Sequence, residues 1–122
     1  MALHSSLPIY KVAYDLLDVA TDVTKNMPRD FKQSLGGKIR DHCIDIVTLI
    51  FRANVSVDKV PHLSDLLESV QTVELLLRLS KDKRFISVPQ YAKAIELTNQ
   101  VGRQANGWRK SASSPVASPS RR

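Results

Sequence analysis

LSDLLESVQTVELLLRL, residues 63–79, carries more apolar surface than one buried face of a helix can use. At about 100° per residue, one stripe of an α-helix collects six of its apolar side chains: Leu63, Leu66, Leu67, Val70, Val73 and Leu77. Leu75, Leu76 and Leu79 point well away from that stripe, at positions where a lone soluble bundle carries charge. These surplus leucines predict a second contact surface, and therefore a chain that works as an oligomer.

Residues 7–26 show the same helical period, with Ser6 as the predicted N-cap and Pro8 in the first turn. A second, narrower apolar stripe lies on one shoulder of this helix and consists of Tyr10, Tyr14 and Leu17. We expect this shoulder to join the surplus leucines in the contact between copies.

A second predicted helix covers residues 29–54. Its period predicts that Phe31 faces the core, and Gly36 and Gly37 lie one or two turns after its start. Two glycines within a helix cost about 1 kcal/mol each relative to alanine. They indicate either a close approach of another backbone or a helix that becomes regular only after them.

The last two helices are joined by a charged turn at residues 81–84. Asp58 is the predicted cap of the third helix, which ends near residue 80. Ser87 and Gln90 have the spacing of a capping box, in which serine bonds forward and glutamine reaches back, and the fourth helix continues to residue 110.

Helices of similar length with short connections predict an all-α, up-down-up-down antiparallel four-helix bundle. We assign this domain to residues 1–111. Residues 112–122 are rich in Ser and Pro and end in two arginines, so we expect a disordered basic tail.

Charge is distributed unevenly along the chain. Residues 1–77 hold eight Lys/Arg against ten Asp/Glu, whereas residues 78–122 hold ten against two. The predicted topology brings the first and third connections to one end of the bundle, with six cations: Arg29, Lys32, Arg78, Lys81, Lys83 and Arg84. The opposite end receives Arg103, Arg109 and Lys110. Such ends attract the phosphate backbone of DNA or RNA, although a solvated face with a basic tail is the alternative interpretation.

Candidate catalytic groups are sparse. His42 is followed by Cys43, but consecutive side chains of a helix diverge by about 100° and do not meet as a nucleophile pair. We interpret His42 as a satisfied core histidine. Glu74 lies within the leucine stripe and needs a partner, for which Arg78, His42 or Arg40 are the candidates. No spacing of histidines or Glu-x-x-His repeat indicates a metal site. We therefore predict a protein that is not an enzyme and that uses no cofactor or metal.

Two aromatic residues lie next to cations, Phe85 in the charged turn and Trp108 before Arg109. Each could stack on an unpaired base, but packing against the core is the favoured interpretation of both. The lone cysteine, Cys43, excludes an internal disulfide and fits a reducing compartment. No apolar run is long enough for a membrane span and the start lacks a secretory signal, so we expect a cytoplasmic protein.

Several short motifs are similar to those of a known family: Met27-Pro28-Arg29, Leu76-Leu77-Arg78-Leu79, and Tyr91 with Val101-Gly102-Arg103 and Gly107-Trp108. Over residues 7–111 the chain resembles the accessory variability determinant (Avd) proteins of diversity-generating retroelements. These belong with the four-helix-bundle proteins encoded by intervening sequences of bacterial large-subunit ribosomal RNA genes. Phe51-Arg52-Ala53-Asn54 stands where that ribosomal branch carries Asn-Ile-Ala-Glu-Gly, which favours the Avd side.

The resemblance implies a basic, pentameric, barrel-like assembly of four-helix bundles that associates with a reverse transcriptase and binds nucleic acid. The leading hypothesis is a non-catalytic nucleic-acid-binding accessory protein that supports the reverse transcriptase of a diversity-generating retroelement. Contacts would be made to phosphates and not to base edges. The alternative hypothesis is a self-associating four-helix-bundle scaffold without a role on nucleic acid.

Overall fold

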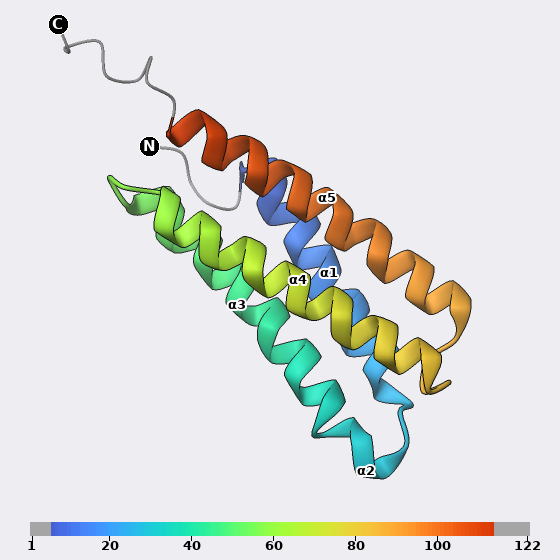
Figure 1. Cartoon of the computed structure of the whole chain (residues 1–122). Coiled ribbons are helices and arrows are strands. Elements are labelled where there is room, and N and C mark those ends of the chain that lie inside the picture. Colours follow the sequence, from blue (N-terminus) through green and yellow to red (C-terminus); the bar gives the residue numbers. More distant parts are fainter. Residues whose placement is uncertain (1–5, 114–122) are drawn as a thin grey trace, which may run out of the picture.

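The computed structural model describes residues 6–113 of the chain, and within them every regular element is a helix. The elements are α1 (Pro8–Lys25), α2 (Arg29–Lys32), α3 (Leu35–Val55), α4 (Val60–Asp82) and α5 (Val88–Ala112). The four long helices run antiparallel to their neighbours in the chain, and α2 is a single turn inside the α1–α3 connection (Figure 1). The predicted four-helix bundle is confirmed.

Each long helix packs against two others, so that α1 contacts α3 and α5 while α4 also contacts α3 and α5. The apolar stripe of each helix faces the shared interior. Fully buried aliphatic side chains come from all four long helices, among them Leu16, Ile39, Ile46, Ile50, Leu63, Leu66, Leu77 and Val101. Removal of this apolar surface from water is the main favourable term in forming the bundle.

The second predicted helix is interrupted in the structure, because α2 ends at Lys32 and α3 begins at Leu35. Gly36 then lies buried in the first turn of α3, directly against α1. A Cβ atom at Gly36 would lie 3.2 Å from the Thr24 Cβ and 3.2 Å from the Arg40 Nη1. Of the two explanations for these glycines, close approach of a neighbouring helix therefore holds at Gly36.

The prediction that Phe31 faces the core is wrong. Phe31 belongs to α2, which ends at Lys32 before α3 begins at Leu35, so the period of α3 does not extend to it. The side chain is 43% exposed and its ring stacks on Phe85, with ring centroids 4.5 Å apart.

The observed helix caps match the predicted caps only in part. Ser87 and Gln90 form the predicted capping box, and Pro8 occupies the first turn of α1. Ser6 is not the N-cap of α1, because Leu7 holds that position without a side-chain hydrogen bond. Lys59 likewise takes the N-cap position predicted for Asp58, whose carboxylate accepts a hydrogen bond from the Val60 backbone N–H at 3.3 Å.

The C-terminal boundaries also shift slightly. α4 continues to Asp82, and α5 extends to Ala112, the first residue of the predicted tail. Residues 114–122 of that tail lie outside the described residues. Among the helices of the described part, none has the length and apolarity needed to cross a lipid bilayer.

Two isoleucines of α3 provide a matched test of the core. Ile46 is fully buried, whereas Ile44 is 49% exposed. We expect Ile46→Ala to lower the free energy of unfolding by about 2–5 kcal/mol because it leaves a cavity. Ile44→Ala serves as the control and should change it by less than about 1 kcal/mol. Urea denaturation followed by circular dichroism measures both, and equal losses would contradict the packing described.

Candidate nucleic-acid interface and apolar surfaces

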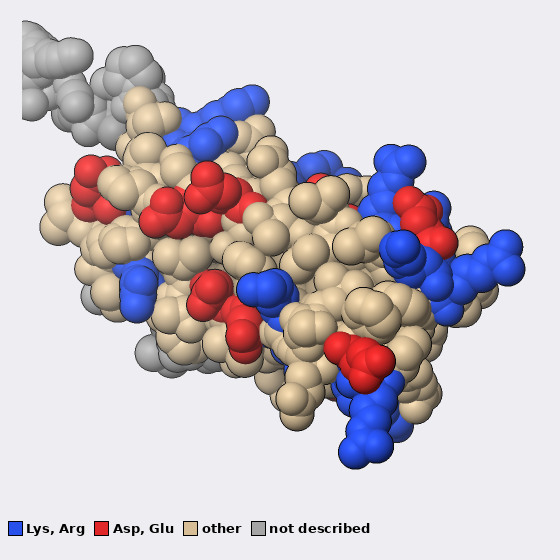
Figure 2. Space-filling model, turned by 60° about the horizontal axis from the view of Figure 1, so that its bottom comes forward, with Lys and Arg blue, Asp and Glu red and all other residues tan. Residues whose placement is uncertain are grey.

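Six of the predicted nucleic-acid contacts meet at one end of the bundle. The α1–α3 connection and the α4–α5 turn lie at this end, and the stack of Phe31 on Phe85 joins them (Figure 1). We call the six cations there the basic end: Arg29, Lys32, Arg78, Lys81, Lys83 and Arg84. The right-hand end of Figure 2, where the α4–α5 turn lies, carries the largest group of Lys and Arg side chains on that face.

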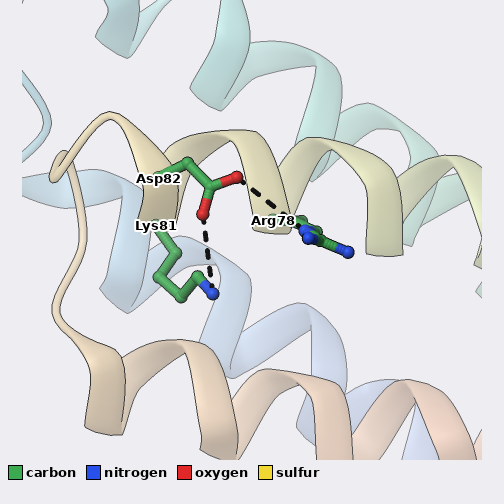
Figure 3. Close-up of polar contacts among 3 residues, drawn as sticks. All are labelled: Arg78, Lys81 and Asp82. Atoms are coloured by element: carbon green, nitrogen blue, oxygen red, sulfur yellow. Dashed lines mark ion pairs between the residues drawn. The ribbon is translucent and has the colours of Figure 1, made fainter.

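Two cations of the basic end share one carboxylate. Asp82 lies between Arg78 and Lys81, with an oxygen 3.8 Å from the Arg78 Nε and another 3.5 Å from the Lys81 Nζ (Figure 3). The Lys81 ammonium also lies 4.8 Å from the centroid of the Tyr91 ring. Exposed pairs of this kind contribute little to stability, and the Arg78 side chain remains 70% exposed.

The other four cations of the basic end are exposed and make no ion pair within residues 6–113: Arg29, Lys32, Lys83 and Arg84. Asp30 and Asp82 are the carboxylates that α2 and the end of α4 contribute beside them. Cations outnumber acids there, so the end presents positive charge to solvent.

Arg84 holds an unusual backbone conformation at the tip of the α4–α5 turn. Its φ of 64° lies in the left-handed region, which costs an L-residue about 1–2 kcal/mol. This conformation ends α4: the Arg84 N–H donates to the Lys81 carbonyl at 2.9 Å and the Phe85 N–H to the Ser80 carbonyl at 2.8 Å. The tight turn thereby places a cation immediately before the aromatic ring of Phe85.

The remaining three predicted contacts lie on the last turns of α5, away from the basic end. Arg103 and Arg109 line a groove between α4 and α5 that also contains Glu68. The Arg109 guanidinium donates to the Asn106 Oδ1 at 3.0 Å and approaches the Ser64 Oγ at 3.4 Å. Lys110 is exposed. These residues form a polar groove with mixed charge and do not extend the basic end.

Glu74 has a structural partner, but not one of the three predicted. Thr98 of α5 donates its hydroxyl hydrogen to the Glu74 carboxylate at 2.8 Å. Arg78 instead pairs with Asp82, and the Arg40 guanidinium donates to Thr24 Oγ1 at 2.8 Å. The prediction failed because Glu74 lies on the side of α4 that faces α5, whereas His42 and Arg40 belong to α3.

Cys43 and His42 do not form a reactive pair. Cys43 is fully buried, and its burial raises the pKa of the thiol to about 12, so the thiol stays protonated at neutral pH. His42 is half-buried, and its Nδ1 is a buried atom without a hydrogen-bond partner. The expectation of a satisfied histidine is therefore wrong for that nitrogen. The described residues contain no group of three or more His, Cys, Asp and Glu side chains placed to hold a metal ion.

The predicted oligomer contacts divide into two groups. Tyr14, Leu75 and Leu79 are 56%, 67% and 42% exposed. The other three are half-buried and pack against the core of their own bundle: Tyr10, Leu17 and Leu76. The bundle therefore leaves half of the surplus apolar residues uncovered.

The structure also shows an exposed apolar surface on α3 that the sequence did not lead us to predict. Phe51 is 37% exposed and stacks on Tyr10 at 6.1 Å between ring centroids, and Tyr10 lies 6.3 Å from the Tyr14 ring. Seven residues earlier, Ile44 takes the equivalent position and is 49% exposed. We call Tyr10, Tyr14, Ile44 and Phe51 the α1–α3 patch. The seven-residue spacing of Ile44 and Phe51 was the available signal.

A family model matches residues 7–112, the same span over which the four long helices pack together. The chain belongs to the bAvd-like family. The resemblance to Avd proteins that the motifs indicated is thereby confirmed. A comparison with curated proteins found no match.

Several motif residues that indicated this family are core residues of the bAvd-like bundle. Met27, Leu77 and Val101 are 4%, 1% and 0% exposed. Gly102 lies beside Val70 of α4, to which an added Cβ would come within 3.8 Å. These positions therefore contribute to how the helices pack.

The buried thiol of this bAvd-like chain makes a direct chemical prediction. Burial raises the pKa of the Cys43 thiol to about 12, so the thiol is almost entirely protonated at pH 8. We expect an alkylating reagent to leave Cys43 unmodified in the folded protein and to modify it readily in concentrated urea, where the pKa returns to its ordinary value. Mass spectrometry measures the modification, and rapid labelling of the folded chain would contradict the burial.

Proposed function

We propose that this chain is a non-catalytic accessory protein of a diversity-generating retroelement, that it binds nucleic acid, and that it supports a reverse transcriptase. Membership of the bAvd-like family supports the accessory role. The observation that carries nucleic-acid binding is the basic end, where exposed cations from two connections meet. We place this activity in the cytoplasm, in keeping with the single reduced cysteine.

Binding at the basic end acts through the phosphate backbone. Arg29, Lys32, Lys83 and Arg84 are available for it because no carboxylate pairs with them within residues 6–113. Phosphate contacts of this kind release counterions, so affinity for DNA or RNA falls steeply as salt rises and depends little on sequence. Arg103, Arg109 and Lys110 provide a second, weaker contact, because Arg109 is engaged by Asn106 and Glu68 lines the same groove.

We further propose that the chain works as a homopentamer. The α1–α3 patch and the exposed pair Leu75 and Leu79 lie on different helices, which suits a head-to-tail contact between two unlike surfaces. A contact of that kind closes into a ring when its rotation allows, and a ring aligns the basic ends of its subunits. The resulting rim of positive charge would bind nucleic acid more tightly than a single subunit.

The alternative function is a self-associating scaffold with no role on nucleic acid. The exposure of Tyr14, Leu75 and Leu79 supports this alternative as well, since those residues serve association whether or not nucleic acid binds. The two proposals differ only in the role of the basic end, which would bind no nucleic acid in a scaffold and would remain solvated.

Filter binding at increasing salt tests the electrostatic mechanism. We expect the double variant Lys32→Glu with Lys83→Glu to bind DNA and RNA at least about tenfold more weakly than the unmodified chain at low salt. Lys11→Glu with Arg52→Glu makes the same change in net charge at exposed positions outside the basic end, and it should lose little affinity. Equal losses in both variants, or affinity that does not change with salt, would rule out a contact localised at the basic end.

Size-exclusion chromatography with light scattering tests the assembly. We expect the unmodified chain to be a multimer, and Tyr14→Asp or Leu75→Asp to shift it towards the monomer because each introduces a charge into an apolar contact. Val57→Asp is the control, since Val57 is fully exposed in the α3–α4 connection and outside both surfaces. If the unmodified chain stays monomeric at micromolar concentration, both the pentamer proposal and the scaffold proposal are wrong.

A further inference from the structure

The basic end contains an exposed aromatic ring that phosphate binding does not explain. Phe31 is 43% exposed on the one-turn helix α2. In a bundle with a well-filled interior, an exposed phenylalanine keeps apolar surface in water without a folding benefit of comparable size. Its position between Arg29 and Lys32 places this ring among exposed cations.

Phe85 supports the exposed Phe31 ring from the side of the core. It is half-buried, packs against the core and stacks on Phe31 with centroids 4.5 Å apart and planes 28° from parallel. The core thereby holds Phe85, and Phe85 covers one side of the Phe31 ring. Phe31 remains 43% exposed in this stack, so the pair forms a step whose outer ring offers apolar surface to a further planar group.

Cations from two separate segments flank this step. Arg29 and Lys32 lie within two residues of Phe31, and Lys83 and Arg84 directly precede Phe85. The turn that carries Arg84 is held by backbone hydrogen bonds to the end of α4. A planar apolar surface between unpaired cations matches the repeating unit of a nucleic acid, in which a base alternates with a phosphate.

We propose that the basic end binds single-stranded nucleic acid, with Phe31 stacking on an unpaired base while the surrounding cations hold the adjacent phosphates. This inference rests on the proposed function and adds the class of nucleic acid that the site prefers. The preference follows because the bases of a duplex already stack on each other and expose no face to a ring outside the helix, whereas an unpaired base does. The inner ring, Phe85, acts as the support of the site.

The test measures binding of the full chain to three probes of equal length: oligo-dT, a strand of the same number of abasic residues, and a duplex. We expect oligo-dT to bind more tightly than the abasic strand. Phe31→Leu keeps apolar bulk against Phe85 but removes the aromatic face, and it should weaken binding to oligo-dT about fivefold or more. Phe31→Trp should retain that affinity. Neither variant should change binding to the duplex or to the abasic strand.

A matched control separates stacking from exposed apolar surface in general. Val57→Ala removes exposed apolar surface from the α3–α4 connection, outside the basic end and outside both proposed association surfaces, and should leave oligo-dT binding unchanged. Unfolding in urea checks that the Phe31 variants remain folded. Equal affinity of the unmodified chain and Phe31→Leu for oligo-dT would overturn the proposal, and so would equal binding of the abasic strand and oligo-dT. A smaller particle in Phe31→Leu would also overturn it, because Phe31 would then contact a second copy of the chain.

Failure of this inference is distinguishable from failure of nucleic-acid binding itself. If Lys32→Glu with Lys83→Glu loses affinity for every probe while Phe31→Leu changes none, the phosphate contact stands and base stacking is excluded. If the unmodified chain binds none of the three probes at low salt, both proposals are wrong.

Discussion

The antiparallel packing of four apolar helix stripes is the constraint on which every surface of this chain depends. It fixes the register of each helix against its neighbours, and the close approach of Gly36 to Thr24 on α1 shows how tightly α3 is held at one end. Because the register is fixed there, the α1–α3 connection and the α4–α5 turn meet, and Phe31 stacks on Phe85. The concentration of positive charge at that end is thus a consequence of core packing.

Basic and apolar residues occupy different parts of the outer surface. The largest group of Lys and Arg side chains lies at the basic end (Figure 2), while exposed apolar side chains lie on the α1–α3 patch and at Leu75 and Leu79. Association through the sides would leave the ends accessible, so the proposed oligomer and the proposed contact with nucleic acid would not compete for the same surface. This arrangement suits an accessory protein that presents several equivalent basic ends to one long polyanion.

Comparison of particular residues shows where sequence reasoning succeeds. The capping box of Ser87 with Gln90 was predictable because its interactions span three residues and do not depend on the fold. The buried stripe of α4 was equally clear from its period. Glu74 shows the limit: its period placed it near the core, but the identity of its partner, Thr98, depended on which helix lay on that side. Phe31 was assigned to the interior because the break between α2 and α3 has no strong local signal.

By itself, the sequence determined that the chain forms four amphipathic helices, that these carry more apolar residues than one bundle can bury, and that cations concentrate at the connections. Periodicity and composition are local properties, so they can be interpreted without knowing which segments pack together in the fold. Only the tertiary structure decided how far each surplus residue is exposed, since Tyr10, Leu17 and Leu76 are half-buried against the core and Tyr14, Leu75 and Leu79 are exposed. It also decided that Phe31 is the outer ring and Phe85 its support. Burial depends on contacts between segments distant in the chain, and those contacts exist only once the helices have packed.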